Sequence, residues 1–454
     1  MPVAAFPLTV AAPSGLVRPA VWLLAGFLAA LGLMVALLWP EQIFVFFAVA
    51  LGVAAVLVAL AFPLAACALW LLAVGLTPDM WLGEMVGPGA GLVIIAALKF
   101  SGILLVGLAA LRFGLVWDGF NPALAFVAMF GIGMMHGLHP NLAPDESLRS
   151  LLGSVAPFAF GFVRLPRRWA QVFAAVILLI PVLSVGLGLG LAGAGLRPVL
   201  VEGMGWRLQG AGHPAFLGGF ALVACYASVL EWLRTGQWRF GAALVLNLLI
   251  LLLSGARGPL AIGVVVVGLA LVFVPAARLG WARRVPFLLG GGLVAVGLFA
   301  AAGWLSGMRV FNLLGAEAAN LSGRDEIWPL FQAAWDASPV WGWGTGAGKV
   351  LVGVETPLAR FLGTNAAHNE YLRIGVESGF VGLGLLVGFF LLWAWRHLRV
   401  LRGPDRWVML LVLAGFAVHS ATDNTLIATT ASGLFAWITT VFARGAREAE
   451  RKDA

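Results

Sequence analysis

Charged residues are scarce in this chain of 454 residues: aspartate, glutamate, lysine and arginine together make up 11% of it. Because soluble proteins contain about 25% charged residues, this balance excludes a soluble globular enzyme, and the apolar share of 61% excludes a disordered chain. The apolar residues form long continuous runs instead of alternating with polar residues, which excludes a transmembrane β-barrel. The composition therefore predicts an all-α polytopic membrane protein.

Cysteine is nearly absent, and so are the most familiar catalytic motifs. Cys67 and Cys225 both lie within apolar runs, so they predict neither a disulfide framework nor a metal cluster. The sequence contains no Gly-x-Ser-x-Gly, no His-Glu-x-x-His and no Asp-x-Asp pair of the kind that holds a nucleotide-sugar metal. It therefore gives no support to a serine hydrolase, a zinc peptidase or a metal-dependent sugar transferase.

The pair His136 and His139, and separately Lys99, each allow a structural interpretation as well as a functional one. His136 and His139, with Asp145 and Glu146 nearby, resemble a metal cluster, but a proline follows the pair and ends the helix. We interpret the pair as the polar outer end of a span and expect no metal site. Lys99 is the one ionisable residue deep in an expected span, where it either lines a substrate cavity or is held by a structural partner.

The apolar runs set the number of membrane spans. A spanning helix needs about 20 apolar residues, which predicts about fourteen spans, or about twelve if Pro63 only kinks a broken or re-entrant pair. The first span is expected to act as an anchor, because no signal-peptide cleavage site precedes it. The expected spans are 20–39, 41–61, 63–76, 89–111, 121–139, 145–162, 169–193, 213–233, 239–254, 257–275, 285–305, 373–395, 406–421 and 424–443.

The net charge of +8 comes from basic residues that lie between the spans. They form no stripe of the kind that binds DNA or RNA, so we expect no nucleic-acid partner. Cytoplasmic loops collect lysine and arginine. Most of the 28 basic residues, including those in segments 164–168, 278–284 and 396–406, fall on one side when both termini are placed in the cytoplasm. This orientation is our prediction.

One outer segment, residues 306–372, is far longer than an ordinary connection. Its many tryptophans and phenylalanines make it too aromatic for disorder, so we expect it to fold at the membrane surface. The chain is thus expected to divide into an N-terminal transmembrane bundle (1–305), a structured periplasmic loop with surface helices (306–372), and C-terminal transmembrane helices with a cytoplasmic tail (373–454).

Two helices are predicted around this loop. The first begins at Ser322 and runs through Trp335, with apolar residues at helical spacing that would lie in the membrane interface. The second begins at Thr364 or Asn365 and runs to Glu377, with Gly379 as its terminator.

Polar residues at the outer face are the candidates for chemistry. Arg207 precedes the span at 213, Arg257 lies at a glycine- and proline-rich break between two spans, and Arg324 begins the first loop helix. A guanidinium group is always charged and matches phosphate oxygens as a fork. Several arginines at one outer cavity would suit a lipid diphosphate, whose departure needs charge stabilisation. For each arginine, contact with a lipid headgroup is the alternative.

His368 is the candidate general base. In the first turn of a helix the positive end of the dipole disfavours a protonated imidazole, and a general base must be neutral to accept a proton. Asn369 and Glu370 follow it and would support the site. The alternative is that His368 is a helix cap or an interface residue.

Several motifs resemble those of the O-antigen ligase and polysaccharide polymerase superfamily, whose members are O-antigen ligase-like membrane proteins. His368-Asn369, nine residues and then Gly379-Phe380-Val381-Gly382 resemble its His-Asn-x9-Gly-x-x-Gly signature. Other similar segments are Ser322-Gly323-Arg324-Asp325-Glu326-Ile327-Trp328, Pro339, Trp341-Gly342-Trp343-Gly344, Ser254-Gly255-Ala256-Arg257-Gly258, and Arg207, Gly210 and His213-Pro214. The resemblance covers residues 206–424 and is most specific within 322–384.

This resemblance implies a metal-independent, GT-C-like glycosyltransferase of the bacterial inner membrane that uses no cofactor. It would move a glycan from undecaprenyl diphosphate to a hydroxyl at the periplasmic face. The acceptor would be lipid A–core for an O-antigen ligase, or a growing polysaccharide for an O-antigen or exopolysaccharide polymerase. In this interpretation His368 is the general base, and Arg207, Arg257 and Arg324 bind the diphosphate. The alternatives are a transporter or flippase of polysaccharide or lipid-linked glycan, and a non-catalytic scaffold.

Overall fold

A computed structural model of the chain describes residues 43–202, 205–311, 324–362 and 364–453, together with residues 26, 30, 31 and 34. Apart from two short antiparallel strands, β1 (Leu200–Val201) and β2 (Arg207–Leu208), the described elements are helices. The α-helices are α2 (Ile43–Ala61), α3 (Pro63–Leu76), α4 (Pro78–Val86), α5 (Pro88–Phe113), α6 (Pro122–His136), α7 (Pro144–Val155), α8 (Arg168–Gly193), α9 (Pro214–Thr235), α10 (Trp238–Leu253), α11 (Arg257–Phe273), α12 (Trp281–Ala300), α13 (Arg324–Ala337), α14 (Pro357–Leu362), α15 (Glu370–Leu398), α16 (Gly403–Ser420) and α17 (Thr429–Asp453).

Membrane-spanning length is met by five of the described helices: α5, α8, α9, α12 and α15 are long and apolar enough to cross a bilayer. Three shorter helices, α6, α10 and α11, are also apolar. This confirms the prediction of an all-α polytopic membrane protein. The total of about 12–14 spans stays a prediction, and the first expected span, 20–39, lies largely outside the described residues.

Two expected spans take a different form. α2 and α3 meet at a bend of 120° just before Pro63, so they form the broken pair that was the alternative for this segment. The expected span 145–162 is wrong: α7 ends at Val155 and a 3-10 helix, Ala156–Phe162, follows. Pro157 explains the change, since it has no N–H to continue the α-helical ladder.

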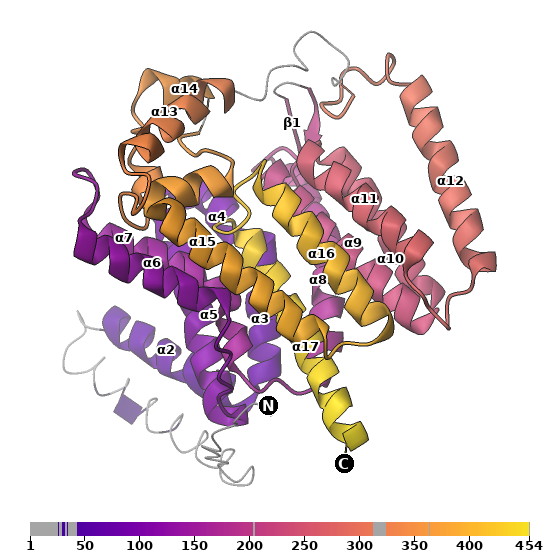
Figure 1. Cartoon of the computed structure of the whole chain (residues 1–454), viewed down its shortest axis with the longest axis horizontal. Helices are drawn as coiled ribbons and strands as arrows, with labels where there is room; N and C mark the ends of the chain where they lie inside the picture. The colour runs from indigo at the N-terminus through magenta and orange to yellow at the C-terminus, as the bar shows by residue number, and fades with distance from the viewer. Residues whose placement is uncertain are drawn as a thin grey trace.

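The core is built around α9, which is buried along almost its whole length. It packs against α3, α8, α10, α11, α16 and α17 (Figure 1). Near its C-terminal end the buried Glu231 accepts a hydrogen bond from Arg444 of α17 at 2.8 Å, and the same guanidinium donates to Asp405 of α16 at 2.8 Å. Because buried charges need partners, this network fixes three helices at the end of the bundle away from α13 and α14.

The helix that follows His368 differs from the expected one. α15 begins at Glu370, after the N-cap residue Asn369, instead of at Thr364 or Asn365. Gly379 has φ 59° and ψ −161°, so the first helical stretch ends at the expected terminator. A second helical stretch follows directly across this kink and runs to Leu398, and α15 comprises both.

This break is where the outer segment is attached. It leaves the carbonyls of Val376 and Glu377 without helical partners, and these accept hydrogen bonds from the N–H groups of Trp343 and Gly344 at 2.9 Å each. In return the carbonyl of Pro339 accepts from the N–H of residue 380 at 2.8 Å. The Trp-Gly-Trp-Gly segment thus supplies partners for the broken helix, as backbone groups at membrane depth require.

α13 packs on this attachment, so that part of its apolar face contacts protein where membrane lipid was expected. Its place at the membrane surface stays a prediction. Its residues Ile327 and Phe331 are fully buried in a small core shared with Leu372 and Val376 of α15. The ring of Trp335 lies over Gly375 of α15. Ile327 and Phe331, on the apolar face of α13, are therefore buried against α15. The expected cap at Ser322 lies outside the described residues.

Substituting Gly379 should test how much the outer segment depends on the break. In Gly379→Ala a methyl group would lie 2.3 Å from the carbonyl carbon of Val340 and would force a positive φ on alanine. We expect the free energy of unfolding to fall by at least about 2 kcal/mol, seen as a lower melting temperature in detergent. Gly388→Ala is the control, since its Cβ would meet nothing within 4 Å. Equal melting temperatures for the two variants would contradict this role of Gly379.

Candidate active site

His368 lies just outside α15, in the left-handed region at φ 50°. Such a backbone conformation is uncommon for a residue other than glycine and is often found at functional sites. The expectation that His368 lies in the first helical turn is therefore wrong. Its ring is instead oriented by side chains: Nε2 lies 3.2 Å from Oγ1 of Thr364, and Nδ1 lies 3.2 Å from Oδ1 of Asp423.

Asp423 is the residue that sequence reasoning missed. It lies between α16 and α17, 3.2 Å from His368 and, through Oδ2, 3.5 Å from Nε2 of His419. Burial favours its neutral form, but the hydrogen bonds from His368 and His419 outweigh burial and hold the pKa of Asp423 below its usual value. The ionised carboxylate can therefore keep a proton on Nδ1 of His368, which leaves Nε2 as an acceptor. Only its polarity between two apolar spans could have signalled it.

The two residues after His368 have structural contacts. Oδ1 of Asn369 accepts a hydrogen bond from the N–H of Leu372 at 3.1 Å and so caps α15. Glu370 is 2% exposed; its Oε2 accepts from Nε of Arg373 at 2.6 Å and its Oε1 from the N–H of Leu426 at 2.8 Å. Glu370 therefore attaches the segment that carries Asp423 to the start of α15.

Arg207 and Arg257 lie side by side, and the structure adds Arg309 to them. Nε of Arg207 donates to the carbonyl of Ser254 at 3.1 Å, and Nη2 of Arg257 donates to the carbonyl of Arg309 at 3.0 Å. Gly255, at φ 63°, lies between Arg207 and Arg309: a Cβ on Gly255 would be 3.2 Å from Cγ of Arg207 and 3.3 Å from Cβ of Arg309. Nothing in the local sequence around Arg309 marked it as a candidate.

The electrostatics connect all four arginines. Burial, together with Arg309 and Arg257, lowers the pKa of Arg207 to about 10. Burial, together with Arg257 and Arg324, lowers the pKa of Arg309. Burial also lowers the pKa of Arg324, and the charge of Asp423 opposes this. Crowded guanidinium groups are costly without an anion, so the cluster of Arg207, Arg257, Arg309 and Arg324, which we call the arginine cluster, suits an anionic ligand.

A cavity of about 330 Å³ lies beside His368 and Asp423. His213, His368, His419 and Asp423 line its polar part, and residues of α9, α16 and α17 line its apolar depth. The apolar lining consists of Phe216, Leu222, Val223, Tyr226, Phe416, Ile427, Ala431 and Leu434, among others. A ligand here would have a polar head near His368 and an apolar portion inside the bundle.

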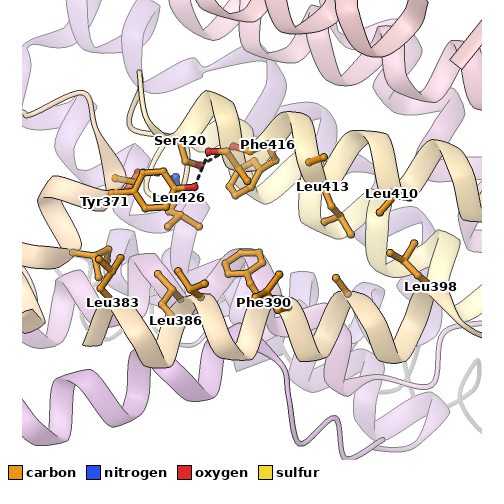
Figure 2. A pocket seen from close by; sticks show the side chains of 17 residues that line it. Tyr371, Leu383, Leu386, Phe390, Leu398, Leu410, Leu413, Phe416, Ser420 and Leu426 are labelled. Carbon is orange, nitrogen blue, oxygen red and sulfur yellow. Dashed lines mark hydrogen bonds between the residues drawn. The ribbon is translucent and has the colours of Figure 1, made fainter. Parts of the chain in front are cut away.

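A second, more apolar cavity of about 280 Å³ lies on the other side of α16. Figure 2 shows leucine and phenylalanine side chains of α15 and α16 pointing toward one another along this groove, with Tyr371 and Ser420 at one end. Glu370 also lines it, only two residues from His368. Phe416 lines both cavities, so α16 separates them. We call the second cavity the α15–α16 groove.

The other polar candidates lie away from these residues. His136 stacks against Trp341 with ring centres 6.1 Å apart, and His139 contacts the edge of Trp343 at 5.6 Å. Lys99 points toward α7, where a Cβ on Gly153 would be 3.9 Å from its Nζ. Within the described part of the chain, no three histidine, cysteine, aspartate or glutamate side chains form a metal-binding group.

Fold and site together define a multi-pass helical membrane protein with a histidine–aspartate pair and an arginine cluster at one end of the bundle. Residues 242–387 match the family described as O-antigen ligase, a stretch of about a third of the chain. The match confirms the resemblance to the O-antigen ligase-like family, whose members are glycosyltransferase-like enzymes. His368, Arg257, Arg309 and Arg324 lie within the matched stretch, and Arg207 and Asp423 lie outside it. No curated protein matches the chain significantly.

The attachment made by Glu370 gives a stability prediction. Glu370→Gln removes one charge partner of the buried Arg373, which keeps only Glu377 at 2.9 Å. We expect a loss of about 2 kcal/mol in the free energy of unfolding, measured as a lower melting temperature. The matched control is Glu355→Gln, which removes an exposed carboxylate paired with Arg360 and should change little. An unchanged melting temperature for Glu370→Gln would refute the anchoring role.

Proposed function

We propose that this protein is an inner-membrane glycosyltransferase that moves a glycan from undecaprenyl diphosphate to a hydroxyl acceptor at the periplasmic face. The observation that carries the proposal is the His368–Asp423 pair, which lines a cavity with both polar and apolar walls. The charge of Asp423 also acts on Arg324 of the arginine cluster. The family match over residues 242–387 supports the same class of reaction.

In the proposed mechanism His368 acts as the general base. With its Nδ1–H donating to Asp423, its Nε2 lone pair faces the hydroxyl of Thr364 and can take the proton of an acceptor hydroxyl that displaces this contact. The hydroxyl of Thr364, 3.2 Å from Nε2, marks where an acceptor hydroxyl would approach. The acceptor oxygen then bonds to the anomeric carbon of the donor sugar while the bond from that carbon to the diphosphate oxygen breaks.

The arginine cluster would hold the diphosphate as it leaves. The departing group carries negative charge and is a weak base, so it needs fixed positive charge more than a proton. Arg207, Arg257 and Arg324 take the role expected from the sequence, and Arg309 joins them. Asn369 and Glu370 support the site through the backbone, because they fix the start of α15 and the segment with Asp423.

Lipid chains of the substrates have two apolar routes beside the site. The depth of the cavity at His368 suits the prenyl chain of the donor, since apolar residues of α9, α16 and α17 line it beyond His368 and Asp423. The α15–α16 groove suits an acyl or prenyl chain, since leucines and phenylalanines line it from Tyr371 to Leu398 (Figure 2). The acceptor is either lipid A–core, as for a ligase, or a growing polysaccharide, as for a polymerase.

The membrane placement is part of the proposal. Both termini are proposed to lie in the cytoplasm, so that α13 and the start of α15 face the periplasm. In the described part of the chain, no observation favours the transporter or scaffold alternatives.

A deletion strain complemented with variants tests the proposal. We expect His368→Ala to insert and fold but to lose transfer by at least about 10²-fold, because no base remains to deprotonate the acceptor. Asp423→Asn should lose at least about tenfold, because the orientation and proton position of His368 are no longer fixed. The readout is the surface polysaccharide profile together with the undecaprenyl-linked pool.

The pools also separate the two reactions. Long glycan left on the carrier lipid beside bare lipid A–core would indicate a ligase, and single repeat units on the carrier would indicate a polymerase. Normal surface polysaccharide with His368→Ala would refute the base assignment. An unchanged pool of undecaprenyl-linked glycan in the deletion strain itself would refute the proposed glycosyltransferase function.

Arg257→Lys tests how the diphosphate is held. Lysine keeps the charge but cannot form two parallel hydrogen bonds, so we expect transfer to fall by about 10²-fold while the melting temperature stays close to wild type. The exposed Arg360 serves as control, and Arg360→Lys should be fully active. Full activity of Arg257→Lys would mean that positive charge alone suffices at this position.

A further inference from the structure

His213 lines the same cavity and has no role in the mechanism above. It is the N-cap residue of α9, and its Nδ1 accepts a hydrogen bond from the N–H of Ala215 at 3.2 Å. An imidazole nitrogen that accepts a hydrogen bond carries no proton, so in the neutral ring the proton is on Nε2. Because Nδ1 faces the helix end, the Nε2–H group points away from it.

Partial burial and the neighbouring arginines both favour the neutral form of His213. Burial, followed by Arg207, Arg197 and Arg309, lowers the pKa of His213 to about 4, although part of the residue stays exposed. At the pH of the periplasm the ring is therefore a neutral hydrogen-bond donor. A neutral donor adds a directed hydrogen bond to an anion without adding another positive charge to the arginine cluster.

The position of His213 suits that task. It lines the cavity with His368, His419 and Asp423, and of the neighbouring charges Arg207 affects its pKa most. Among the described residues, Nε2 of His213 has no hydrogen-bond partner. This donor without a protein partner lies on the cavity that His368 lines and within the electrostatic influence of Arg207, so it is available to the sugar–diphosphate bond of a donor bound there.

We propose that His213 contacts the donor substrate and that its Nε2–H donates a hydrogen bond to a diphosphate oxygen of the leaving group. This inference rests on the proposed function. His213 gives up no proton in this role: the leaving oxygen takes the bonding electron pair, and the hydrogen bond stabilises the charge that develops on it. His213 also keeps its second task, capping α9 through Nδ1.

Two substitutions separate these tasks. In His213→Asn the amide oxygen can replace Nδ1 as the cap of α9, but no donor reaches the position of Nε2. In His213→Gln the amide nitrogen reaches that position, while the cap is poorer. We expect His213→Asn to fold normally and lose about 10- to 100-fold in kcat, and His213→Gln to recover most of that activity.

The assay uses purified full-length protein in proteoliposomes with an undecaprenyl-diphosphate-linked glycan, and kcat and KM are measured at about pH 6 and pH 8. Since His213 is neutral at both values, the fold-loss in His213→Asn should be the same at each. Wild-type kcat for His213→Asn, with a lower melting temperature for His213→Gln, would mean that His213 is only a helix cap, and would overturn the inference.

Binding of undecaprenyl diphosphate alone, measured by thermal shift, separates a failure here from a failure of the proposed function. We expect about tenfold weaker binding by His213→Asn and little change with His213→Gln. If both variants turn over at the wild-type rate and all three proteins bind the lipid equally well, only the proposed role of His213 is overturned. If the wild-type protein binds the lipid but transfers no glycan, the proposed glycosyltransferase function is overturned, and the comparison of binding by the three proteins decides whether His213 contacts the diphosphate. If the wild-type protein does not bind the lipid, both proposals are overturned.

Discussion

The end of the bundle that carries α13 depends on the break in α15 at Gly379. Inside a bilayer a broken helix needs other partners for its backbone groups, and here the Trp-Gly-Trp-Gly segment provides them through Val376 and Glu377. That attachment positions α13, whose apolar face then packs on α15. As a result Arg324, the first residue of α13, comes under the electrostatic influence of Asp423, nearly a hundred residues further along the chain.

The site balances charges that would each be costly alone. Glu370 holds Arg373 and the N–H of Leu426, and so places Asp423 against His368. Burial, together with repulsion from neighbouring arginines, lowers the pKa of Arg207 and of Arg309 on the other side of the site. A lipid diphosphate would relieve that repulsion, and the apolar cavities on the two sides of α16 would receive its chain and that of the acceptor. In the proposed function, recognition and chemistry would share one set of charges.

Much of the fold could be predicted from local pattern. Continuous apolar runs gave the all-α class, and helices such as α8 and α9 begin and end within two residues of their expected bounds. The predicted bounds and environment of a helix were wrong where a proline interrupted the segment or where another helix packed against it. Pro157 divided an expected span into α7 and a 3-10 helix. α13 was expected in the interface, but Ile327 and Phe331 are buried against α15, a surface that no property of residues 324–337 announces.

The sequence by itself determined the membrane class and the chemical groups available at the outer face, because apolar length and residue type are local properties. It singled out His368, Arg207 and Arg257 on that basis. Only the tertiary structure decided which groups meet: Asp423 beside His368, Arg309 beside Arg257, and His213 on the same cavity. These partners are 50 or more residues apart from one another along the chain. No helical or loop periodicity relates such positions, so only the packing of α9, α11, α15 and α16 brings them together.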